Sequence, residues 1–321
     1  MKIIKFSEDQ SSKWDNFLEL CPMATFLHSR RFLSYHGNRF KDESLIVTDD
    51  DGTWLGVFPS AVDPGDASQI ISHPGITYGG LVHNGKLIGS NMLEALGLIF
   101  QHYKENNYSK VLYKAIPTFY HQVPSCDDLY ALCQLKAELC RRDLSCTIDL
   151  ISPSLLSNKA LSKMRNMIRK AEKNNVTLED SNHNLEQLWE ILRENLKKKY
   201  NKNPVHSFEE MKTLLEKFPN NIGLLVAKIK DRVISGAVIF KKNIATHTQY
   251  LVNTECGKEN FALDYIIQEC INKAKEEKYR FFDFGINTEN NGMYLNNNLF
   301  LSKAKHGGSG SVHDHYLLKI S

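Results

Sequence analysis

Polar side chains that could move protons or bind a ligand are concentrated between residues 245 and 308. Residues 245–252 alternate as the residues of a β-strand do, and they contain His247. Asp264 falls in the first turns of the helical pattern that follows, and Glu289 comes after the next strand. Because ligands of α/β proteins bind at strand ends, these residues predict an active site at the junctions of a β-α-β-α unit.

The residue types indicate which of these groups could serve in proton transfer. His247 has an unperturbed pKa of about 6.5 and could take a proton from an ammonium group, although it could also be a satisfied core or surface histidine. Asp264 and Glu289 are also candidate bases, but an acid at a helix start is stabilised by the helix dipole, and a Glu in an Asn-rich turn could simply be hydrated. Tyr250 is a candidate acid for a leaving group. Asp283, inside an aromatic strand, is predicted to be buried and structural.

The organisation of the chain predicts two domains. Its 321 residues are too many for one ordinary hydrophobic core. Strand and helix patterns follow one order in residues 1–153 and a similar order in residues 154–321, which we predict to be the two domains. The fold class is therefore predicted to be α/β with mixed sheets, and a cleft is expected between the domains.

A family resemblance supports this organisation. The segment LSKMRNMIRKAEKNNV at residues 161–176 is similar to the basic helix that opens the second domain of tandem GNAT proteins in the FemAB-like group. Residues 115–132 and 141–150 resemble members of that group from bacterial surface-polysaccharide gene clusters. The resemblance covers most of the chain and implies two tandem GNAT-like domains. The matching positions in the basic helix are Arg165, Asn166, Arg169, Lys170 and Ala171.

The resemblance implies an N-acyltransferase that uses acyl-CoA and no metal, by direct attack of an amine on the acyl donor. In GNAT proteins the donor lies in a gap between the fourth and fifth strands, with its diphosphate at the start of the following helix. The glycine fingerprint of that helix start is only partly present in TECGKENFA, so the half of the chain that holds the donor stays open. The implied donor-binding residues are Gly257, Lys258, Asn260, Phe261, Asn296 and Lys303.

The acceptor implied by the resemblance is the amino group of a nucleotide-linked sugar. A dTDP-3-amino-3,6-dideoxyhexose is favoured, acylated with an acetyl or hydroxyacyl group such as 3-hydroxybutanoyl for O-antigen or capsule synthesis. One alternative is FemAB-type transfer from aminoacyl-tRNA to a peptidoglycan precursor, and another is a non-catalytic module that binds a sugar nucleotide or a partner. The predicted substrate-binding residues are Arg165, Arg169, Lys170, Tyr120, His121, Gln249 and Tyr78.

Composition excludes several other classes. The net charge of +3 arises from 40 basic and 37 acidic residues, and this balance does not predict DNA binding. Seven cysteines without C-x-x-C spacing predict reduced thiols, and His313, Asp314 and His315 lack a third metal-ligand signature. We find no signal peptide and no apolar run of about 18 residues, so a cytoplasmic protein without a membrane span is expected.

Overall fold

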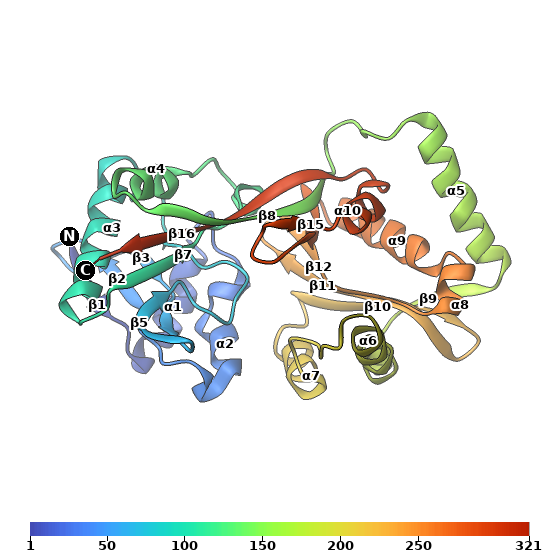
Figure 1. The fold of residues 1–321 in the computed structure, drawn as a ribbon, viewed down its shortest axis with the longest axis horizontal. Coiled ribbons are helices and arrows are strands. Elements are labelled where there is room, and N and C mark those ends of the chain that lie inside the picture. The colour runs from blue at the N-terminus through green and yellow to red at the C-terminus, as the bar shows by residue number, and fades with distance from the viewer. Residues whose placement is uncertain (321) are drawn as a thin grey trace. The chain divides into compact units, whose positions relative to one another are not determined.

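The computed structural model describes residues 1–320, apart from the side chains of residues 199 and 200. It contains two compact units (Figure 1). The first unit comprises Met1–Leu144, Thr288–Leu295 and Ser311–Ser321, and the second comprises Ser145–Asn287 and Asn296–Gly310. The predicted domain boundary, between residues 153 and 154, stays a prediction.

The first unit is a mixed α/β structure. Its strands β1, β2, β3 and β6 form one sheet in that order, and β4, β5 and β7 belong to another. Its elements are β1 (Lys2–Lys5), α1 (Ser11–Leu18), α2 (Arg30–Leu33), β2 (Leu45–Thr48), β3 (Trp54–Phe58), β4 (Ala61–Asp63), β5 (Asp66–Ile71), β6 (Val82–His83), α3 (Ser90–Glu105), β7 (Lys110–Lys114), α4 (Asp127–Gln134) and the hairpin of β14 (Thr288–Glu289) with β15 (Tyr294–Leu295).

The second unit repeats this order with longer strands. Its sheet runs β13-β12-β11-β10-β9, and β12 and β13 are parallel neighbours. Its elements are α5 (Asn158–Lys173), β9 (Val176–Asp180), α6 (Leu185–Tyr200), α7 (Phe208–Lys217), β10 (Ile222–Ile229), β11 (Arg232–Lys242), β12 (Ala245–Asn253), α8 (Glu255–Glu259), α9 (Ala262–Glu276), β13 (Phe281–Ile286) and α10 (Asn297–Ala304).

Two long strands each contribute to both units. β16 (Ser309–Lys319), the last strand of the chain, pairs with β7 of the first unit from His315 to Lys319, as its red ribbon shows in Figure 1. β8 (Glu138–Asp149) follows α4, yet its last residues pair with β13 of the second unit. Each half of the chain therefore ends in a strand that completes a sheet in the other unit. The predicted α/β class with mixed sheets is confirmed.

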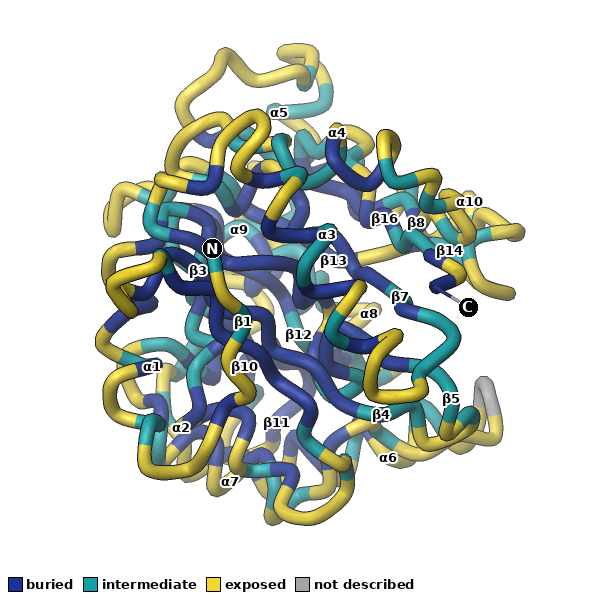
Figure 2. The backbone as a smooth tube through the Cα atoms, turned by 90° about the vertical axis from the view of Figure 1, so that its left-hand side faces the viewer, coloured by how far each residue is buried: buried dark blue, intermediate teal, exposed yellow. Residues whose placement is uncertain are grey.

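Apolar periodicity explains the core of the second unit. Ile266, Ile267 and Ile271 recur at helical spacing along α9, and all three are buried. They pack with Ala237 and Phe282, which point from β11 and β13 to the same side of the sheet. Figure 2 shows β10, β11 and β12 as buried along most of their length. No helix within residues 1–320 combines the length and the apolar content needed to cross a bilayer.

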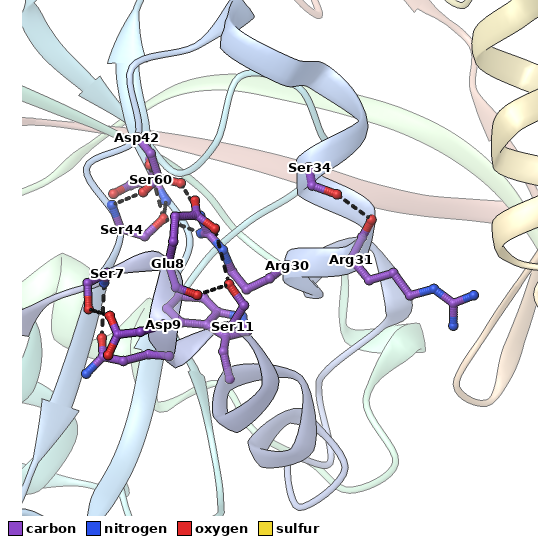
Figure 3. A network of polar contacts seen from close by, with 12 residues as sticks. Ser7, Glu8, Asp9, Ser11, Arg30, Arg31, Ser34, Asp42, Ser44 and Ser60 are labelled. Atoms are coloured by element: carbon purple, nitrogen blue, oxygen red, sulfur yellow. Dashed lines mark hydrogen bonds and ion pairs between the residues drawn. The ribbon is translucent and has the colours of Figure 1, made fainter.

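A buried arginine organises the start of the first unit (Figure 3). The Arg30 guanidinium binds the Asp42 carboxylate, and it donates to the Ser44 hydroxyl at 3.1 Å. Its cation lies 3.7 Å from the centre of the Phe6 ring and 5.2 Å from that of Trp14. Arg30 thus links α2 to the strand edge and to the aromatic core by charge and by ring contact.

We predict that Arg30→Met lowers the free energy of unfolding by about 2–4 kcal/mol, because the buried Ser44 hydroxyl and the partly exposed Asp42 carboxylate lose their partner. Urea unfolding followed by circular dichroism measures this change. Arg31→Met is the matched control, since the neighbouring Arg31 is exposed, and its effect should stay within about 0.5 kcal/mol. Equal effects of the two substitutions would contradict the role given to Arg30.

Candidate active site

The parallel strands β12 and β13 separate partway along their length. They pair only from Ala245 to His247 on β12 and from Phe281 to Asp283 on β13, although β12 continues to Asn253. We call the point of separation, at His247 and Asp283, the fork. Parted parallel strands leave backbone groups and space that a ligand can occupy between them.

A histidine and an aspartate are hydrogen-bonded at the fork. His247 Nδ1 lies 2.7 Å from Asp283 Oδ2, and Asp283 is completely buried. The other carboxylate oxygen accepts from the Ser145 hydroxyl at 2.5 Å and from the Gly285 amide at 3.0 Å. These bonds fix the carboxylate, and the carboxylate fixes the imidazole so that Nδ1 carries the proton toward Asp283. Asp283 is therefore buried, as the sequence predicted, and it also orients the candidate base.

Gly285 is required beside this pair. Its φ of +77° lies in the left-handed region, and a Cβ atom built there would come within 3.1 Å of His247 Cε1. Any side chain at this position would strain the backbone and press on the imidazole ring.

A cavity of about 540 Å³ lies within the second unit, beyond the fork. β12 contributes Leu251 and Asn253 to its wall, past the point at which β12 leaves β13. The start of α9 and the inner face of α10 supply most of the remaining wall, with single turns of α5 and α6. These residues are Met167, Leu192, Asn195, Leu196, Lys258, Phe261, Leu263, Asp264, Ile267, Leu299, Ser302, Lys303, Lys305 and His306.

The charges along this cavity favour an anionic ligand. Lys258, Lys303 and Lys305 line it, together with only one carboxylate, Asp264. Asp264 is ion-paired with Lys305 at 2.5 Å and lies 3.4 Å from His306 Nε2. Burial lowers the pKa of His306 to about 4, so this ring is neutral at pH 7.

Lys303 connects the cavity to the end of β13. Its ammonium donates to the carbonyl oxygens of Gly285 at 3.0 Å and Ile286 at 3.1 Å, just after the fork. Burial lowers its pKa to about 8, against an opposing effect of Asp283 and Cys146. An ammonium has three donors, so Lys303 can hold both carbonyls and still bind a ligand atom in the cavity.

The start of α9 adds a second favourable feature for an anion. The first backbone bond at this end runs from the Tyr265 amide to the Phe261 carbonyl, so the amides of residues 262–264 precede the helical ladder. No side chain caps this end. The partial positive charge of a helix N-terminus therefore adds to the cavity lysines.

Gly257 has a packing role in this structure. Its amide donates to the Thr254 hydroxyl at 3.0 Å, and a Cβ atom there would lie 2.1 Å from Asn253 Oδ1 and 2.4 Å from the Ile234 carbonyl. The glycine allows α8 to approach β11 and β12 closely. The Gly257 amide is thus already bonded to Thr254, and the donor contact implied for Gly257 stays a prediction.

The corresponding place in the first unit is filled by the chain itself. β5 and β7 are parallel and pair only from Gln69 to Ile71, after which residues 72–80 fold back beside β7. The Gly79 amide donates to the Lys114 carbonyl at 3.0 Å, and the Lys114 ammonium binds the Ile76 carbonyl. At the start of α3, the Asp127 carboxylate already accepts from the Gly89 amide at 2.8 Å. The open fork is thus in the second unit.

Several predicted donor-site residues come together and others do not. Lys258, Phe261 and Lys303 line the cavity, together with Asp264, which was predicted as a candidate base. Asn260 instead bonds to the Cys256 carbonyl and to Asn174, and Asn296 caps α10 through the Leu299 amide.

The predicted substrate-binding residues occupy different surroundings. Arg165 and Arg169 lie on α5, and the Lys170 ammonium lies 5.5 Å from the centre of the Phe261 ring at the cavity wall. The Tyr250 hydroxyl is 2.7 Å from His206 Nδ1, next to the half-buried Gln249.

Four predicted residues lie in the first unit. Tyr78 and Tyr120 are completely buried, and their ring centres lie 4.9 Å apart. His121, which follows Tyr120, is half-buried, and Glu289 is exposed on β14.

Sequence reasoning missed Lys305, His306 and Asn253 as cavity residues. Lys305 and His306 meet Asp264 only after α10 folds back over α9, and no spacing in the sequence reveals that contact. The K-x-K-H run was the one available signal.

The comparisons place an acyltransferase domain of the GNAT class in the second unit. Residues 158–291, which contain the fork and the start of α9, match the family model described as an acetyltransferase (GNAT) domain. The predicted GNAT-type N-acyltransferase is confirmed at this level. No curated protein matches the sequence.

Solved structures agree on the fold. FemX superposes with a TM-score of 0.67 at 12% identity, covering 98% of this chain and 97% of that one. L-PGS from Bacillus licheniformis has a TM-score of 0.62 at 15% identity, with 97% and 92% covered. A tandem GNAT protein from the clavulanic acid biosynthesis pathway has a TM-score of 0.52 at 9% identity, with 100% and 98% covered. These likenesses show that the chain has the tandem GNAT, Fem-like fold.

We predict that His247→Gln and Asp283→Asn each lower kcat by about 100-fold or more, because one removes the base and the other its orientation. Steady-state kinetics across pH measures the loss. The residual activity of Asp283→Asn should show a pH profile that is shifted from that of the wild type, since the imidazole loses its anionic partner. Thr248→Val is the neighbouring control on β12 and should keep a wild-type profile. Full activity in both fork variants would contradict this assignment.

We also predict that donor affinity falls as pH rises through about 8, where Lys303 loses its charge. The lysine is protonated below that pH and neutral above it, so an anionic donor is held best on the acid side. Calorimetric titration with acetyl-CoA on both sides of this pH tests the effect, because the acyl oxygen is the donor atom expected nearest Lys303. Lys303→Met should bind more weakly and show a flatter pH dependence, and an unchanged pH dependence in that variant would contradict the prediction.

Proposed function

We propose that this chain is an N-acyltransferase that binds acyl-CoA in the cavity of the second unit and transfers the acyl group to the amino group of a nucleotide-linked sugar. The observation that carries the proposal is the fork: parted strands, a hydrogen-bonded His247–Asp283 pair at their junction, and a cationic cavity beyond it. Coenzyme A has the matching shape and charge, because it joins a narrow, largely uncharged arm to an anionic diphosphate.

The wall of the cavity has a cationic part and an apolar part, which would bind different parts of the donor. Lys258, Lys305 and the start of α9 would hold the phosphates, as cations and a helix N-terminus do. Leu251, Phe261 and Ile267 would line the path of the arm toward the fork. Lys303, which bonds the carbonyls just beyond the fork, would meet the acyl oxygen and stabilise the charge it gains.

The proposed reaction is a direct displacement at the thioester carbon. The amine nitrogen forms a bond to the carbonyl carbon, and the carbon–sulfur bond breaks as the tetrahedral intermediate collapses. His247, oriented by Asp283 through Nδ1, takes the proton that the amine loses and can return it to the departing thiolate. No covalent enzyme intermediate is needed.

The acceptor class rests on the family resemblance of the chain. A dTDP-3-amino-3,6-dideoxyhexose is the favoured substrate, with an acetyl or 3-hydroxybutanoyl donor, in the synthesis of a surface polysaccharide. Tyr120, His121 and Tyr78 stay predictions for substrate binding, and Glu289 stays a predicted catalytic residue.

The basic helix α5 favours a second candidate, which is transfer from aminoacyl-tRNA. Arg165 and Arg169 are on this helix, and its Met167 and Lys170 reach the cavity wall and Phe261. A cationic helix beside the donor cavity could receive nucleic acid phosphates. The shared fold with FemX and L-PGS supports the same candidate, since transfer from aminoacyl-tRNA is the FemAB-type reaction.

The deciding experiment combines acyl-CoA donors with dTDP- and UDP-linked amino sugars, and it follows thiol release and product mass. We expect CoA release that requires both substrates and disappears in His247→Gln. The second candidate would be supported by transfer from charged tRNA only. That activity should fall steeply at higher salt and in the double variant Arg165→Ala/Arg169→Ala. No transfer from any donor, by protein that still binds a sugar nucleotide, would contradict both and indicate a binding module.

A further inference from the structure

A second cavity, of about 310 Å³, lies within the second unit at the other end of α9. It is enclosed by the amino end of β12, the first half of β10, the end of β11 and the last turns of α9. It shares no lining residue with the donor cavity. Its volume is at the low end for ligand pockets, which suits a small metabolite and excludes a nucleotide.

The mouth of this cavity carries charges of both signs. Lys273 Nζ lies 2.7 Å from Asp180 Oδ2, and Lys241 Nζ lies 2.7 Å from Glu277 Oε2. All four side chains are between 31% and 63% exposed. Ion pairs this exposed contribute little to stability, so a ligand can exchange with one partner at small cost. A ligand that carries both an ammonium and a carboxylate complements both signs at once.

Part of the lining is apolar. Leu225, Ile239 and Ala274 form its floor. Cys270 also lines it, and burial raises the pKa of that thiol to about 12, so it stays neutral. The Thr246 hydroxyl is buried here and has no hydrogen-bond partner within the described part of the chain. Apolar atoms of a ligand would therefore gain most from entering this space.

Gly223 leaves part of the space open. This residue of β10 lines the cavity, and a Cβ atom built on it meets nothing within 4 Å. Its backbone is not in the left-handed region, so nothing in the local conformation requires glycine. In a strand interior, a glycine that neither the backbone nor the packing demands is consistent with room kept for a ligand.

We propose that this cavity binds a small apolar α-amino acid, with its ammonium and carboxylate at the Lys273–Asp180 and Lys241–Glu277 pairs and its side chain on the apolar floor. Such a site goes beyond the proposed transfer reaction and does not depend on it. Helix α9 touches both cavities, through Asp264 and Ile267 at one end and Cys270 and Lys273 at the other. The two sites are thus joined by one rigid element.

Calorimetric titration of the full chain with L-leucine, L-methionine and L-phenylalanine tests the proposal. We expect saturable binding of one molecule per chain for at least one of them. For L-leucine the matched analogues are 4-methylpentanoate, which lacks the ammonium, and isopentylamine, which lacks the carboxylate. Each should bind at least about tenfold weaker, because one charged contact is lost.

Gly223→Val is the test variant, because valine suits a strand and its side chain would fill the cavity. It should lose amino acid binding while keeping the wild-type unfolding midpoint and coenzyme A binding. Ser302→Phe, in the wall of the donor cavity, is the control and should keep amino acid binding. Absence of saturable binding by folded wild-type protein, or equal binding by folded Gly223→Val, would overturn the site. If the two single-charge analogues bind as tightly as L-leucine, the proposal that the ligand is zwitterionic is overturned.

Discussion

The hydrogen bond between His247 and Asp283 is the contact on which the rest of the candidate site depends. It lies at the last paired position of two parallel strands, so it marks where β12 and β13 part. The carboxylate is completely buried, and a buried charge is tolerated only when its partners are in place. Ser145, Gly285 and His247 supply those partners from three different strands. The same bonds hold the strand ends together and orient the imidazole.

The two units share one topology but differ at the point where their parallel strands separate. Both contain a pair of parallel strands that separate, but residues 72–80 fill the gap in the first unit and a cationic cavity follows the gap in the second. The backbone N–H and C=O groups at such a gap need hydrogen-bond partners, because leaving them buried and unpaired costs free energy. In the second unit Lys303 satisfies two of those carbonyls without closing the space. This difference is why we propose the donor site in the second unit, which the partial glycine fingerprint alone did not indicate.

Much of the fold could be predicted from local patterns. The strand predicted at residues 245–252 agrees within one residue with β12 (Ala245–Asn253), because side-chain alternation is a local property. The exchange of β8 and β16 between units was not predicted, since any long strand can add to more than one sheet edge. Side-chain partners were also beyond reach. The pairing of His247 with Asp283 depends on strand register, and the burial of Tyr78 and Tyr120 depends on tertiary packing.

A crystal structure of the chain with coenzyme A and the amino acceptor tests the central claim most directly. The account predicts the diphosphate at Lys258, Lys305 and the start of α9, with the thiol end reaching Lys303 and His247 at the fork. Coenzyme A bound in the first unit, or in the second unit without approaching His247, would contradict it.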